Sequence, residues 1–198
     1  MAGADKAALR RRLLAARRRV GGDVRAAEAR MLCDALETLA CAGTACAYVP
    51  VGTEPGSVAM LDMLARRCGR VLLPVARTHA DGTPMPLRWG EYRPGALTAG
   101  PWGLLEPAEP WLPDSALAEA ALVIVPALAV DRRGVRLGRG AGFYDRSLAG
   151  RDPDARLIAV VRDAELLDEL PAEPHDVAMT DALTPRRGVI GLASGTRE

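Results

Sequence analysis

The sequence predicts an α/β protein, a three-layer α/β/α sandwich with a mostly parallel central sheet. Residues 44–76 have the form strand, helix, strand, an arrangement typical of parallel strands joined by a crossover helix. Residues 121–130, "ALVIVPALAV", are apolar throughout, as expected of a central strand buried on both faces. Because 198 residues is close to the usual length of one domain, we expect a single domain over residues 1–198.

In the first half of the chain, the elements follow from apolar spacing and helix-start signals. Leu9, Leu13 and Leu14 recur at helical spacing after Asp5, a residue type that often caps a helix, so residues 5–19 should form a helix. Similar signals predict a second helix from about 23 to 40, a strand at 44–51, a helix at 55–68 and a strand at 70–76.

The second half begins with an irregular segment, residues 77–113, which is rich in Gly and Pro and holds all three tryptophans. Long segments of this kind are often functional, and we expect one strand in it, at 85–89. Beyond the apolar run, the patterns predict a helix that opens near Phe143, a strand at 156–161 and a helix at 163–170.

Charge and cysteine usage bound the class of protein. The net charge of +1 provides no overall field that would attract nucleic acid or an anionic membrane. The four cysteines lack metal-ligand spacing and indicate small buried thiols in a reducing compartment. The apolar run at 120–130 is too short to cross a bilayer. We therefore expect a cytoplasmic monomer that binds small molecules, and neither nucleic acid nor a membrane.

The most unusual stretch is Asp131 to Leu148, "DRRGVRLGRGAGFYDRSL", with four glycines and five arginines directly after the apolar run. Glycines between a strand and a helix let the backbone approach an anion closely, while the first amides of the helix point at it. Arg136 and Arg139 would add charge-assisted contacts to phosphate oxygens. The stretch matches neither the dinucleotide-binding nor the Walker fingerprint. The alternative is a tight surface turn with solvated arginines.

Four other residues have both a structural and a functional interpretation. Asp145 either compensates the dipole at a helix start or binds Mg²⁺ beside a phosphate. Asp176 either forms an Asx-type turn or is a second carboxylate ligand of that ion. Glu54 follows the first predicted strand at a helix start, where it either compensates the helix dipole or holds a donor of a polar ligand, since open α/β sheets bind ligands at the carboxyl ends of their strands. Trp102, in a Gly-Pro segment, either anchors its loop or stacks on a flat heterocycle.

Several stretches, in this order, resemble the 5-formyltetrahydrofolate cyclo-ligase family. They cover nearly the whole chain, and the fifth is the most specific. In sequence order they are "KAALR", "TEPGS", "VLLPV", "WGLLEP", "VPALAVDRRGVRLGRGAGFYDRSL" and "PHDVAMTDALT". The resemblance implies ATP-driven ring closure of 5-formyltetrahydrofolate to 5,10-methenyltetrahydrofolate, with ADP and phosphate as products and a phosphorylated formyl intermediate.

The resemblance also implies roles for residues of this chain. Arg139 and Tyr144 would be catalytic. Asp145 and Asp176 would hold Mg²⁺, the expected cofactor. The ATP-binding residues would be Lys6, Arg10, Arg136, Gly138, Arg139, Gly140, Ala141, Gly142, Phe143, Tyr144, Asp145 and Arg146. The folate-binding residues would be Glu54, Met85, Trp102, Arg139, Gly140, Ala141, Gly142, Phe143 and Tyr144.

Two other functions remain open at this point. One is a nucleotide- or RNA-binding protein that keeps the fold but has lost catalysis, which the arginine-rich first helix and the glycine loop would permit. The presence of Lys6, Glu54, Asp145 and Asp176 argues against it. The other is a sugar-phosphate enzyme of similar architecture, which leaves Lys6, the only lysine of the chain, and Trp102 without a role.

Overall fold

The computed structural model describes residues 2–173 and 176–193. The helices are α1 (Ala2–Arg18), α2 (Gly22–Glu37), α3 (Val58–Arg67) and α4 (Phe143–Ser147), with short 3₁₀ helices η1 (Pro101–Gly103), η2 (Asp114–Glu119), η3 (Leu148–Gly150) and η4 (Asp163–Glu165). The strands are β1 (Thr44–Cys46), β2 (Arg70–Val75), β3 (Arg88–Glu91), β4 (Leu97–Ala99), β5 (Leu105–Pro107), β6 (Ala120–Pro126), β7 (Ala129–Asp131), β8 (Arg136–Leu137), β9 (Arg156–Val160), β10 (Leu166–Leu167), β11 (Asp181–Thr184) and β12 (Gly188–Gly191).

Seven strands form the central sheet in the order β12-β11-β9-β6-β1-β2-β3. Its five inner strands are parallel to one another, and only the edge strands β3 and β12 run antiparallel. The predicted α/β class with a mostly parallel sheet is therefore confirmed. The chain moves outward from β1 to β2 and β3, then returns to the other side of β1 with β6 and continues to β9 and β11. The strand order thus reverses between β1 and β6.

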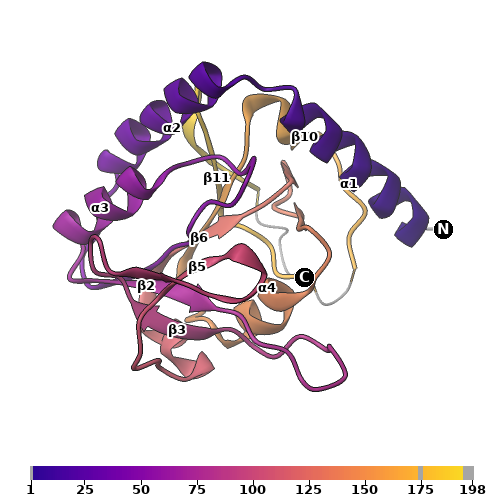
Figure 1. Ribbon diagram of the computed structural model, residues 1–198. Coiled ribbons are helices and arrows are strands. Elements are labelled where there is room, and N and C mark those ends of the chain that lie inside the picture. The colour runs from indigo at the N-terminus through magenta and orange to yellow at the C-terminus, as the bar shows by residue number, and fades with distance from the viewer. Residues whose placement is uncertain (1, 174–175, 194–198) are drawn as a thin grey trace.

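Apolar clusters cover both faces of this sheet. On one face, α2 and α3 lie side by side (Figure 1) and bury Leu32, Leu36, Met60 and Leu64 against strand residues such as Ile124. The other face is covered by short elements rather than by long helices. These elements supply Leu117 of η2 and Leu148 of η3, which pack with Trp89 and Val123. The second helical layer of the sandwich is therefore made of short helices and loops.

Helix α1 lies apart from α2 and α3, against a small second sheet in the order β10-β7-β8 (Figure 1). Lys6, Arg10, Leu13 and Arg17 recur at spacings of three or four, so they share one face of the helix. Leu13 packs in a cluster with buried leucines of the small sheet and its loops. The face that holds this apolar contact therefore directs three cationic side chains toward the protein.

The predicted strand at 121–130 is two strands in the structure. β6 ends at Pro126, and β7 begins at Ala129 in the small sheet, where it pairs with β8 and β10. Proline has no amide hydrogen to donate to a neighbouring strand, so the central ladder stops there. Composition did not reveal this break, because both strands are buried and apolar.

The predicted helix at 163–170 is wrong. Only residues 163–165 form a short 3₁₀ turn, and Leu166 and Leu167 then pair with β7. The Leu170 amide donates to the buried Asp131 carboxylate at 2.9 Å. Since these partners lie more than 30 residues away in the chain, tertiary hydrogen bonds override the local helical pattern.

The irregular segment 77–113 contains three strands where one was predicted, because the short strands β4 and β5 pair with each other in a separate two-stranded sheet. The remaining elements agree with their predictions except in their bounds. The predicted strand at 44–51 is only three residues long, and the one at 85–89 is shifted to β3. The expectation of four buried thiols is wrong for Cys41 and Cys68, which form a disulfide, whereas Cys46 is a buried free thiol and Cys33 is half-buried. No helix in the described ranges is both long and apolar enough to span a membrane.

Candidate functional site

The candidate site lies at the carboxyl ends of β1 and β6, where the strand order reverses. Ligands of open α/β sheets bind in the crevice at such a switch point. A cavity of about 330 Å³ is present here, lined mainly by apolar side chains. Its walls come from the loop after β1, the end of β2, the end of β6, β5 with its preceding residue, and the segment 136–145.

The glycine loop, residues 138–142, lies between this larger cavity and a smaller one of about 130 Å³. Gly138 and Gly140 line both cavities. Gly140 and Gly142 have φ values of +100° and +79°, and residues with a Cβ atom rarely adopt positive φ. A Cβ at Gly138 would lie 2.8 Å from a guanidinium nitrogen of Arg136. The loop therefore brings its backbone to the border of both cavities.

The smaller cavity is lined by charged groups from both ends of the chain. Lys6 is buried, and its ammonium lies 3.5 Å from Asp176 and 3.3 Å from Glu173. Arg10 donates from Nε to the Gly138 carbonyl at 3.0 Å. Helix α1 thus brings two cations to the back of the glycine loop, which explains why an N-terminal lysine and a distant aspartate belong to one site.

Arg136 and Asp145 form an ion pair that borders both cavities. The Arg136 side chain is almost fully buried, while that of Asp145 is partly open at 39% exposure. Burial lowers the pKa of Arg136 and the adjacent Asp145 opposes this effect, so the guanidinium remains the cation of the pair. Asp145 lies in the first turn of α4, where the helix dipole favours a carboxylate.

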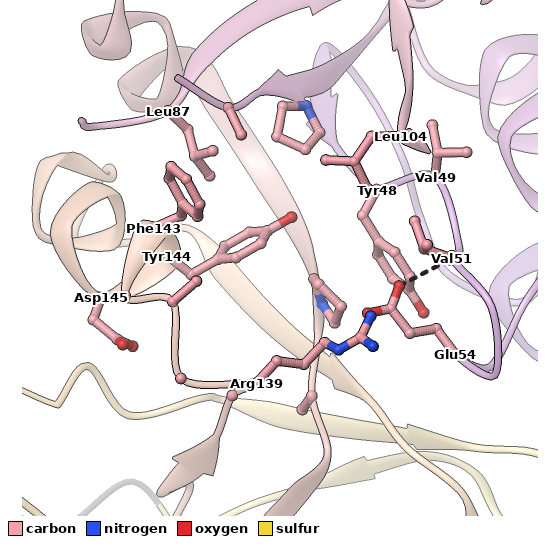
Figure 2. Close-up of a pocket in the computed structure, with 18 of the residues that line it drawn as sticks. Tyr48, Val49, Val51, Glu54, Leu87, Leu104, Arg139, Phe143, Tyr144 and Asp145 are labelled. Carbon is pink, nitrogen blue, oxygen red and sulfur yellow. Dashed lines mark hydrogen bonds and ion pairs between the residues drawn. The ribbon is translucent and has the colours of Figure 1, made fainter. Parts of the chain in front are cut away.

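On the side of the larger cavity, Arg139 reaches toward Glu54 (Figure 2), and its Nη1 lies 3.3 Å from the Glu54 carboxylate. The other oxygen of Glu54 accepts from the Val51 amide at 3.0 Å, which fixes the turn that carries it. The Glu54 side chain is 10% exposed and that of Arg139 is 51% exposed. The carboxylate is therefore held in place, whereas the guanidinium is open to a ligand.

The Tyr144 hydroxyl is buried and has no hydrogen-bond partner among the residues that the structure describes. Its ring extends into the cavity between Phe143 and the loop after β1 (Figure 2). Burial raises the pKa of Tyr144, so the hydroxyl stays protonated and can donate. Tyr48 on the opposite wall differs, because its hydroxyl donates to the Pro55 carbonyl at 2.6 Å. Tyr144 is thus the hydroxyl available to a ligand.

Ala141 and Phe143, both predicted, line the larger cavity. Three other predicted site residues, Met85, Trp102 and Arg146, are absent from the described linings of both cavities. Trp102 is 62% exposed with φ +57°, and its ring centroid lies 6.2 Å from that of Phe143, which places it at the margin of the cavity.

Sequence reasoning missed several wall residues of the larger cavity. One is Glu106, whose two oxygens accept from Arg77 at 2.9 and 2.8 Å. The Arg77 guanidinium also lies over the Trp111 ring, 4.4 Å from its centroid. A Glu-Pro pair at the end of a predicted loop gave no periodic signal, although its place in "WGLLEP" beside Trp102 could have directed attention to it.

The charged groups of the smaller cavity suit a metal ion that arrives with phosphates. Asp145 and Asp176 line the same cavity, but no group of three or more typical ligands gathers within the described part of the chain. Mg²⁺ at phosphate sites is commonly held by one or two carboxylates together with phosphate oxygens and water. The donor set therefore fits such an ion, with the phosphate completing its coordination.

A glycine loop that borders both a polar and an apolar cavity at the switch point of an α/β sheet is the arrangement expected of a protein that binds small ligands. Comparison with known proteins agrees with this class. The model of the 5-formyltetrahydrofolate cyclo-ligase family matches residues 2–185. The chain belongs to this family of ligases.

Relatives and solved structures support the assignment. A protein named 5-formyltetrahydrofolate cyclo-ligase from Mycolicibacterium smegmatis is 59% identical over 95% of this chain and 97% of its own. The enzyme of that name from Escherichia coli is 28% identical over 74% of this chain and 80% of its own. An NMR structure of 5,10-methenyltetrahydrofolate synthetase from Aquifex aeolicus shares the fold, with a TM-score of 0.76, 21% identity and coverage of 98% and 95% of the two chains.

Replacing Lys6 should weaken anion binding in the smaller cavity. We expect Lys6→Met to raise the Kd for inorganic triphosphate by roughly tenfold or more, because a hydrogen bond from a charged donor contributes about 1.5–3 kcal/mol. Calorimetric titration would measure it. Arg12→Met is the control, since Arg12 is exposed on the same helix, and it should change the Kd less than about twofold. Equal effects of the two variants would remove Lys6 from the site.

Proposed function

We propose that the protein closes the ring of 5-formyltetrahydrofolate to give 5,10-methenyltetrahydrofolate at the expense of ATP, with release of ADP and phosphate. The observation that carries this proposal is the glycine loop, whose backbone borders both the polar and the apolar cavity. A phosphate in one cavity and a folate in the other would meet beside this loop, whose side chains at Arg139 and Ala141 line only the larger cavity. The names of its relatives supply the substrate.

The polar cavity would take the ATP phosphates. Lys6 and Arg10 from α1 and Arg136 from β8 provide the cations, and the amides of the glycine loop provide neutral donors. Arg139 would reach the transferred phosphate from the other side of the loop. Arg146 is exposed, and its Nη1 donates to the Gly142 carbonyl at 3.1 Å. It would contact more distant parts of the nucleotide only after a rearrangement.

The apolar cavity would take the pterin ring of the folate. Glu54 would accept from the N–H groups of the ring, since its position is fixed by the Val51 amide. Phe143 and Tyr144 would cover a ring face, and Trp102 at the margin would close over the ligand. Met85 is kept as a folate-binding residue on the family resemblance, since the described lining of this cavity does not include it. Because both cavities combine residues from the two halves of the chain, we also propose that the chain acts as a single domain.

In the first proposed step, the formyl oxygen of the substrate attacks the γ-phosphorus of ATP, and ADP leaves. The formyl carbon is then bonded to a phosphate ester and joined to N5 as an iminium. In the second step N10 attacks this carbon, the N10 proton is lost, and the C–O bond breaks with departure of phosphate. These steps require alignment and stabilisation of charge rather than a protein nucleophile.

The residues around the loop would supply this alignment. Tyr144 would donate its hydroxyl hydrogen to the oxygen that is phosphorylated, and Arg139 would neutralise charge on the transferred group. Asp145 and Asp176 would hold Mg²⁺, which lowers the negative charge of the phosphates when bound. The reaction needs no membrane or nucleic acid, and we propose that a monomer carries it out in the cytoplasm.

The proposal is tested by incubating the purified protein with 5-formyltetrahydrofolate, ATP and Mg²⁺ and recording the near-ultraviolet absorbance of the methenyl product. We expect product only when all three are present, with one ADP formed per product. Absence of ATP-dependent product would reject the proposed activity and favour a binding function for the same cavities.

Tyr144→Phe should impair catalysis without destabilising the fold. Since the hydroxyl has no partner among the described residues, its removal leaves nothing unpaired, and we expect an unchanged or slightly higher melting temperature. We expect kcat to fall by at least roughly tenfold, as for the loss of a donor to a reacting oxygen. Because burial raises the pKa of Tyr144, both proteins should keep the same alkaline limb of the pH profile.

Tyr48→Phe is the matched comparison for stability. This variant leaves the Pro55 carbonyl without its donor, so it should lower the free energy of unfolding by about 1–3 kcal/mol. If Tyr144→Phe destabilised the protein as much as Tyr48→Phe and left kcat unchanged, the Tyr144 hydroxyl would be a structural group.

Asp145→Asn should raise the Mg²⁺ concentration required for half-maximal activity, because an amide is a weaker ligand for a hard cation than a carboxylate. The measurement is a Mg²⁺ titration at fixed ATP and folate. Asp154→Asn, which neutralises an exposed carboxylate nearby in sequence, should leave the titration unchanged. An unaltered Mg²⁺ dependence of Asp145→Asn would make Asp145 a helix-start residue only.

A further inference from the structure

One buried ion-pair network lies beneath the larger cavity and has no part in the proposed chemistry. Its centre is Glu165 in η4, which is 5% exposed. Both Glu165 oxygens accept from Arg17 at 2.7 Å, and one of them also accepts from the Arg162 backbone amide at 2.7 Å. Arg17 and Arg162 are themselves 2% and 7% exposed. Desolvating three charged groups is costly, so burial of the network is weak evidence that it stabilises the fold.

Each arginine of the network also donates to a backbone carbonyl of a loop in the candidate site. Arg17 donates from Nη2 to the Ala127 carbonyl at 2.6 Å, and Ala127 lines the larger cavity after β6. Arg162 donates from Nη1 to the Thr53 carbonyl at 3.0 Å, directly before Glu54. The loops that follow the neighbouring strands β1 and β6 are thus both linked to the Glu165 carboxylate, which lies after β9.

The two arginines share the larger cavity but differ in what else they hold. The Nε of Arg162 donates to the Glu28 carboxylate of α2 at 2.8 Å. This contact orients the guanidinium, whose Nη1 donates to the Thr53 carbonyl. Arg17 ends the face of α1 that carries Lys6 and Arg10 to the smaller cavity. Arg162 therefore orients the turn of Glu54, and Arg17 orients the helix that brings the phosphate-side cations.

We propose that Glu165 is a positioning residue that holds Arg17 and Arg162 so that the folate-side turn and the phosphate-side helix keep their relative placement. The assignment of the two sides to folate and ATP rests on the proposed function, whereas the placement itself does not. The network touches no substrate. Its loss should therefore raise KM values more than it lowers kcat. Arg162 should affect the folate alone, whereas Arg17 should affect both substrates.

The test uses Arg162→Lys and Arg17→Lys in the full chain, because lysine keeps the positive charge but its single nitrogen cannot form both arms of the contact. Arg156→Lys is the matched control. Arg156 begins the strand that Arg162 follows, and it donates to both Asp181 oxygens at 2.8 and 2.7 Å, away from the cavities. It should lower the melting temperature without altering the kinetics.

For Arg162→Lys we expect the KM for 5-formyltetrahydrofolate to rise roughly fivefold or more, as for the loss of one charge-assisted hydrogen bond, with kcat and the KM for ATP within about twofold. Arg17→Lys should raise both KM values, because Arg17 holds Ala127 of the larger cavity as well as the helix that carries Lys6 and Arg10. A rise in the KM for ATP in Arg162→Lys equal to the rise for the folate, or kinetics of both variants that match Arg156→Lys, would overturn the proposal and leave a network that only stabilises the fold.

Amide hydrogen exchange supplies a readout that is independent of activity. In the protein without ligands, Arg162→Lys should accelerate exchange in residues 49–54 several-fold, while Arg156→Lys should not. Unchanged exchange there would refute the positioning role even if catalysis changed. If Arg162→Lys fails to fold, Glu28→Gln, which removes only the charge that orients Arg162, should produce a smaller acceleration in the same segment. A wild-type protein without product would reject the proposed activity but leave this measurement decisive.

Discussion

The parallel pairing of β6 with β1 on one side and with β9 on the other is the constraint on which the candidate site depends. Parallel neighbours end at the same edge of a sheet, so the segments that follow these three strands must meet there. The chain leaves β1 and β6 in opposite directions, which keeps the crevice between them open. Pro126 is the last residue of β6, and the chain then forms β7 and β8 of the small sheet before it reaches the glycine loop.

Within this crevice, the cations that would meet phosphate are already paired with carboxylates. Lys6 lies beside Asp176, Arg136 beside Asp145, and Arg139 beside Glu54. A ligand that combines phosphate, metal and N–H donors can replace these contacts one for one, so that no buried charge is left unpaired. This pairing reconciles a local anion site with a net charge of only +1.

Local sequence signals predicted the glycine loop and its flanking elements because their requirements are local. Positive φ at Gly140 and Gly142 needs glycine, and buried strands need apolar residues. The network of Arg17, Glu165 and Arg162 escaped prediction since its main pair is 148 residues apart in the chain. The same carboxylate, with the pairing of β10 to β7, explains why the leucine pattern at 163–170 does not form a helix.

The thinness of the glycine loop determines what the two cavities can do together. A Cβ at Gly138 would lie 2.8 Å from a guanidinium nitrogen of Arg136 and would displace that cation. A Cβ at Gly140 would make only ordinary contact with Arg10 at 3.6 Å, so Gly140 is required by its φ of +100° rather than by space. The two residues of the loop that carry side chains, Arg139 and Ala141, line the larger cavity and are absent from the described lining of the smaller one. In the proposed reaction the formyl oxygen must approach the γ-phosphorus beside this loop. A loop that places no side chain in the smaller cavity can donate amides to a phosphate there and leave that approach open.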